Sequence, residues 1–122
     1  MKVFLPFAAL AAVVTMPAIA DCVAPVASIT IPDSATATKD ELVTASKAIK
    51  AYDLDVQTFT SCLEQEEEGA ITALGDKATA DQKAKVKKQY ELRSDNEVDK
   101  LLAMRDKINI AIRAYKARNP AQ

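Results

Sequence analysis

The chain has 122 residues, with 16 Lys or Arg against 17 Asp or Glu and a formal net charge of −1. It contains no histidine and only two glycines, which argues against histidine-based catalysis, common metal sites and phosphate-binding glycine loops. The small net charge and the scarcity of aromatic residues argue against nucleic acid as a partner. We therefore expect no catalytic residues, no metal and no cofactor.

Residues 1–20, MKVFLPFAALAAVVTMPAIA, have the pattern of an export signal, with an early lysine, an apolar run and a small-residue cleavage site. This run is too short and too proline-rich to be a good membrane span. We expect cleavage near Ala20 and a soluble mature protein in the periplasm or outside the cell. An alternative is a lipoprotein with Cys22 as the lipidated residue, although Asp21 is not the small residue that this requires.

Residues 21–37, DCVAPVASITIPDSATA, combine two prolines with β-branched residues and therefore predict an extended arm. Cys22 and Cys62 are the two cysteines of the chain, and an even pair in an exported protein predicts a disulfide. Because Cys62 lies far along the next element, the arm has to run back beside it. Small residues mark the expected track on one flank: Thr44, Ala48, Ala51, Asp55 and Thr58.

A capping box at Thr38 and Glu41 predicts a first helix over about 39–68, or to 74, depending on whether Gly69 or Gly75 ends it. Apolar residues recur along it at spacings of three and four, which is typical of one buried face. These residues are Leu42, Ala45, Ile49, Tyr52, Val56, Phe59 and Leu63.

A second capping box at Thr79 and Gln82 predicts a second helix over about 80–118, which ends before Asn119 and Pro120. Its stripe toward the first helix consists of Val98, Leu101, Arg105, Ile108, Ile112 and Tyr115, and the Arg105 side chain is expected to extend to the edge of the seam. The two helices together predict an all-α domain over residues 38–122. Its form is a long antiparallel two-helix hairpin, coiled-coil-like, with the arm disulfide-linked to the first helix.

Charge is divided unevenly along the chain after the signal. Residues 21–76 hold three Lys or Arg against eleven Asp or Glu, whereas residues 77–122 hold twelve against six. Antiparallel pairing then predicts that the acidic run of the first helix faces the lysines of the second, with an acidic surface patch or an ion site as alternatives. The groups are Glu64, Glu66, Glu67 and Glu68 on one side and Lys83, Lys85, Lys87 and Lys88 on the other.

Several short motifs are similar to those of a group of small exported proteobacterial proteins that have no assigned function. The similar stretches are Cys22-x-x-Pro25, Ile31-Pro32-Asp33, Tyr52 to Glu64, Asn96 to Asp99 and Ile112 to Lys116. The arm departs from the pattern at Ser34, directly after Ile31-Pro32-Asp33, where glycine is expected. The resemblance implies an exported Gram-negative protein and assigns no catalytic residues.

We expect a non-catalytic interaction module, adaptor- or chaperone-like, that binds another envelope protein or itself. The candidate partner surface contains Leu92 and Ile110, which lie opposite the expected buried face of the second helix and away from the arm. One alternative is a small-ligand carrier with a cavity where Val23, Val26 and Ile29 meet the helices. Another is an enzyme that uses carboxylates or Tyr hydroxyls. Membrane-surface binding is disfavoured, because the first helix uses the apolar face of the second.

Overall fold

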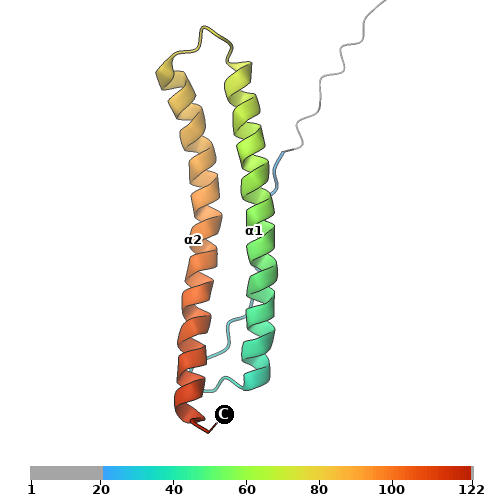
Figure 1. The fold of residues 1–122 in the computed structure, drawn as a ribbon, viewed down its shortest axis with the longest axis vertical. Coiled ribbons are helices and arrows are strands. Elements are labelled where there is room, and N and C mark those ends of the chain that lie inside the picture. The colour runs from blue at the N-terminus through green and yellow to red at the C-terminus, as the bar shows by residue number, and fades with distance from the viewer. Residues whose placement is uncertain (1–20, 122) are drawn as a thin grey trace, which may run out of the picture.

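The computed structural model describes residues 21–121, which form an extended arm and two long helices (Figure 1). Helix α1 spans Lys39–Ala73 and helix α2 spans Ala80–Arg118. The two helices pack side by side and run antiparallel, which confirms the predicted all-α hairpin. The expected signal peptide, residues 1–20, lies outside the described residues. Within residues 21–121, neither helix is apolar enough over a sufficient length to cross a membrane.

Both helices begin where the capping boxes predicted. The Thr38 hydroxyl accepts a hydrogen bond from the Glu41 backbone N–H, and the Glu41 carboxylate accepts one from the Thr38 backbone N–H. Thr79 and Gln82 make the same reciprocal pair at the start of α2. Each box satisfies backbone donors that have no partner inside the helix, and so fixes the first residue of the helix.

The turn between the helices is short and contains Gly75. This glycine has a φ of 78°, a left-handed conformation that L side chains rarely adopt. Of the two predicted ends of the first helix, the structure therefore has the one at Gly75, and Gly69 lies inside α1. Because α1 continues to Ala73, only a short turn separates it from α2, which begins at Ala80.

The core lies in the seam between the helices. All seven apolar residues predicted for the buried face of α1 are buried: Leu42, Ala45, Ile49, Tyr52, Val56, Phe59 and Leu63. On α2 the buried residues are Glu97, Leu101, Ile108 and Ala111, so two of the six predicted positions, Leu101 and Ile108, are buried. Val98, Ile112 and Tyr115 are partly buried and pack against the core, whereas Arg105 is exposed. The predicted face of α2 is therefore rotated about the helix axis relative to the observed one. The prediction used large apolar residues and so left out Glu97 and Ala111.

The arm packs over the seam and contacts both helices. Ala27, Ile29 and Ile31 pack against the core that α1 and α2 form together. Figure 1 shows the arm beginning beside α1, passing behind it and reaching the lower end of α2 before it enters α1. There the Arg118 guanidinium donates hydrogen bonds to the carbonyls of Ser34 and Ala37.

The predicted track of the arm along small residues of α1 is wrong, since Ala51, Asp55 and Thr58 are exposed. The physical reason is the larger apolar area that the isoleucines of the arm remove from water over the seam.

Candidate functional site

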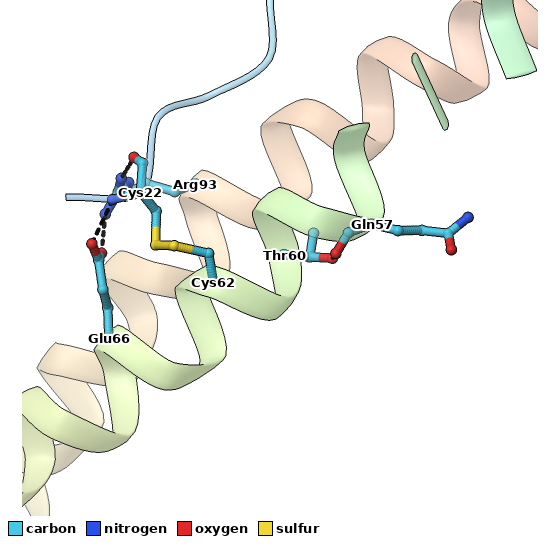
Figure 2. Close-up of a disulfide and its surroundings, with 6 residues drawn as sticks. All are labelled: Cys22, Gln57, Thr60, Cys62, Glu66 and Arg93. Atoms are coloured by element: carbon cyan, nitrogen blue, oxygen red, sulfur yellow. Dashed lines mark hydrogen bonds and ion pairs between the residues drawn. A yellow bond between two sulfur atoms is a disulfide. The ribbon is translucent and has the colours of Figure 1, made fainter. Parts of the chain in front are cut away.

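The arm is fixed to the middle of α1 by the predicted disulfide. Cys22 and Cys62 are bonded, with their Cα atoms 5.8 Å apart (Figure 2). The Cys22 sulfur belongs to a small cluster that includes Phe59 and Leu63, so the bond is packed against the core. The start of the arm therefore cannot leave the hairpin without reduction or partial unfolding.

A second anchor beside the disulfide consists of Glu66 and Arg93. The backbone N–H of Cys22 donates to Glu66 Oε1 at 2.5 Å, and Arg93 Nη1 donates to Glu66 Oε2 at 3.2 Å. Arg93 Nη2 also donates to the Cys22 carbonyl at 2.9 Å, and these groups converge in Figure 2. The guanidinium lies 5.8 Å from the ring centroids of Phe59 and Tyr90. One Arg on α2 thus ties together the arm and α1, because its fork carries several donors in fixed directions.

Three potential metal ligands meet at this anchor: Cys22, Cys62 and Glu66 have ligand atoms within 4.8 Å of one another. The two sulfurs are bonded to each other, and both Glu66 oxygens accept hydrogen bonds. The Arg93 charge next to Glu66 also opposes a cation. The arrangement is suited to holding the arm in place, and the thiolates needed for metal binding would exist only after reduction.

Another polar contact in the buried face of the hairpin joins Tyr52 to Glu97. The Tyr52 hydroxyl donates to Glu97 Oε2 at 2.7 Å, and Lys100 Nζ donates to Glu97 Oε1 at 2.7 Å. Tyr52 and Glu97 are only 3% and 4% exposed, whereas Lys100 reaches solvent. Both carboxylate oxygens therefore have a donor, which is the condition for burying a charge without a large loss of stability.

Burial, with the Glu97 carboxylate beside it, raises the pKa of Tyr52 to about 12. For Glu97, burial acts to raise the pKa, but the hydrogen bonds from Lys100 and Tyr52 and the charge of Lys100 outweigh it and lower the pKa. At neutral pH the pair is a phenol that donates to a carboxylate. Such a pair joins α1 to α2, and its hydrogen-bonding atoms are covered by protein.

The acidic run of α1 is paired differently from the prediction. Glu66 forms an ion pair with Arg93. In the described part of the chain, no ion pair joins the acidic run of α1 to the four predicted lysines. Glu67 and Glu68 do line the same shallow hollow as Lys87. The helices are therefore oriented as charge predicted, and Lys87 lies beside the acidic run, but the buried contact uses an arginine.

Arg105 lies at the edge of the seam, as expected for a charged residue within the apolar stripe. Its guanidinium donates to Asp53 Oδ2 at 2.5 Å, and the Arg105 side chain is 45% exposed. The long side chain brings its charge to solvent, as Arg and Lys commonly do when their Cα faces an apolar seam. The contact adds a third connection between α1 and α2.

Leu92 and Ile110 lie beside the arm and not on a face that the arm avoids, which corrects the sequence-based placement. Leu92 lines a hollow with Ala24, and Ile110 lines another with Ile29 and Ile31. Leu92 is 56% and Ile110 51% exposed. Two valines of the arm are more exposed still, Val23 at 84% and Val26 at 87%. We call these four residues, Val23, Val26, Leu92 and Ile110, the arm-side ridge.

Comparisons of this chain with protein-family models, with curated proteins and with solved structures found no match in any of the three.

Proposed function

We propose that the protein is an exported, non-catalytic interaction module, adaptor- or chaperone-like, which binds a helical segment of another envelope protein on the arm-side ridge. The observation that carries this proposal is the ridge itself. Val23 and Val26 are the most exposed large hydrophobic residues among those that the structure describes, and they lie on a segment held by a disulfide. Exposed apolar side chains on a rigid scaffold favour binding, because few side chains lose freedom when a partner docks.

The dimensions of the ridge suit a helical partner. Leu92 and Ile110 are 18 residues apart on α2, which corresponds to about 27 Å along the helix axis. A partner helix of about five turns covers that length, and apolar residues at spacings of three and four would contact the ridge. Ala103 and Ala117 lie on the same side of α2 at about 20° from Leu92 and Ile110, and small residues permit close approach of a partner.

The periplasm or the extracellular space is the proposed compartment. The support is the disulfide, which persists in an oxidising environment and is rare in the cytosol. The export pattern of residues 1–20 points the same way.

Site-specific photo-crosslinking in cells tests the proposal. A photoreactive amino acid is placed at Val26 or at Ile110, and as a matched control at Leu54, a 64% exposed residue of α1 that does not belong to the ridge. We expect Val26 and Ile110 to label the same envelope protein and Leu54 not to label it. The adduct should disappear when Leu92→Lys is added, while helix content is unchanged.

Two results would contradict the proposal. One is that the ridge positions yield no adduct, and the other is that all three positions label the same proteins. If the adduct is a second copy of this chain, the ridge serves self-association, and sedimentation of the Leu92→Lys/Ile110→Lys variant should then show a smaller species than the parent.

A further inference from the structure

The two sides of the hairpin seam differ, because the arm covers only one of them. On α1, Ser46 and Cys62 lie about 160° apart, and on α2, Lys107 and Lys116 lie about 180° apart. Cys62 and Lys107 are on the side that the arm occupies. Ser46 and Lys116 line an open hollow of about 460 Å³ that no residue of the arm lines. That volume is within the range of small-molecule sites.

The floor of this hollow is apolar. Leu42 and Ile112 come from opposite helices, and Val43 adds an apolar side chain that is 44% exposed. The hollow lies at the end of the rod where α1 begins and α2 ends, away from the interhelical turn. An apolar chain or ring placed there would remove these side chains from water.

The rim of the hollow is basic. It consists of four exposed lysines, three from α1 and one from α2: Lys39, Lys47, Lys50 and Lys116. No Asp or Glu is among the lining residues. None of the four takes part in an ion pair with another group of residues 21–121. We call this site the lysine-rimmed hollow.

The composition of α1 makes this arrangement specific. Residues 21–76 carry three Lys or Arg and eleven Asp or Glu, and all three cations line the hollow. All the cations of this otherwise acidic segment lie around one apolar site. They therefore create a local positive potential there, which attracts anions. The ordinary role of exposed lysines, solubility, gives no reason for them to surround an apolar floor.

From this charge complementarity we propose that the lysine-rimmed hollow binds a small amphipathic anion: a single apolar chain or ring with a carboxylate, sulfate or phosphate at one end. The apolar part lies on Leu42, Val43 and Ile112, and the head group lies among the ammonium groups of the rim. This site goes beyond the proposed function, since it uses the side of the hairpin opposite the arm-side ridge.

The test is a titration of the disulfide-intact mature protein, residues 21–122, with dodecanoate below its micelle concentration, followed by the methyl NMR signals of Val43 and Ile112. We expect saturable shifts of these signals with dodecanoate and none with dodecyltrimethylammonium, which has the same chain and a positive head. Lys47→Glu/Lys50→Glu should weaken binding about tenfold or more, because two attractive contacts become repulsive. Lys85→Glu/Lys88→Glu, the same charge change on exposed lysines elsewhere, should leave it within about twofold.

Three outcomes would overturn the proposal. Equal binding of both amphiphiles would show non-specific apolar adsorption, and equal weakening by the two lysine pairs would show an effect of net charge alone. Binding to phosphatidylglycerol vesicles without any shift by dodecanoate would identify a membrane surface as the occupant. Because photo-crosslinking at Val26 and Ile110 reports on the other side, either proposal can fail without the other.

Discussion

Tyr52→Phe removes one hydroxyl from the buried pair of the hairpin and tests whether that pair holds the helices together. In the structure the hydroxyl donates to Glu97 at 2.7 Å, and both residues are less than 5% exposed. The substitution leaves a buried carboxylate with Lys100 as its one donor within the described chain. A hydrogen bond to a charged group contributes about 1.5–3 kcal/mol to the free energy of unfolding, so we expect a loss of that size.

Urea denaturation followed by circular dichroism measures the effect, and the midpoint should fall by about 1 M. Tyr90→Phe is the matched control, because the Tyr90 hydroxyl makes no hydrogen bond among residues 21–121. It should cost less than about 0.5 kcal/mol. Equal effects of the two substitutions would refute the assigned role of the Tyr52 hydroxyl.

A second substitution at the same site sharpens the test. Glu97→Met in the Tyr52→Phe background removes the buried acceptor as well as the donor, which can be close to neutral when shape is kept. We therefore expect the double variant to be more stable than Tyr52→Phe alone. Additive losses would mean that Glu97 and Tyr52 do not depend on each other.

The same pair predicts how stability depends on pH. The lowered pKa of Glu97 contributes stability that is present above the usual 4.5 and is lost as pH falls through the lowered value. The raised pKa of Tyr52 contributes stability that is present below 10 and is lost as pH rises through about 12. Tyr52→Phe should abolish the alkaline loss, as urea midpoints between pH 9 and 12 would show. An unchanged alkaline loss would assign it to another group.

Three further predictions concern the arm and the register. Cys22→Ala/Cys62→Ala should lower the free energy of unfolding by about 3–4 kcal/mol in urea denaturation, since the bond closes a loop of 40 residues; a loss under about 1 kcal/mol would be inconsistent with a native staple. Arg93→Gln should speed reduction of the disulfide by dithiothreitol, because the arm loses an anchor next to it, and an unaltered rate would contradict that anchor. A carbodiimide should join Glu67 to Lys87 within one chain, and products formed only between chains would contradict the hairpin register.

Local signals in the sequence were sufficient for the outline of the fold. The capping boxes at Thr38 and Thr79 placed both helix starts, since they depend only on residues three apart. The apolar spacing of α1 identified its buried face for the same reason. The disulfide followed from the cysteine count and the reach of the arm. Each of these inferences uses information within a few residues or a simple count.

The polar contacts between distant residues were not predictable in this way. Glu97 stands in a run of charged residues that reads as solvated surface, and only the position of Tyr52 on the other helix explains its burial. Arg93 is likewise one of many cations on α2, and its role depends on where the arm begins. The lysine-rimmed hollow requires the three-dimensional position of Lys116 relative to Lys39, which follows from the register of the whole hairpin.

The path of the arm underlies both proposed binding sides, and methyl NMR measures it directly. In the disulfide-intact protein, residues 21–122, nuclear Overhauser effects should connect the methyl groups of Ile29 or Ile31 with those of Ile110, which line one hollow together. None should connect these arm residues with Val43, on the opposite side of the seam. Effects between Ile29 or Ile31 and Val43, or the absence of any contact with Ile110, would contradict the arrangement in which the arm fills one side of the hairpin and leaves the other open.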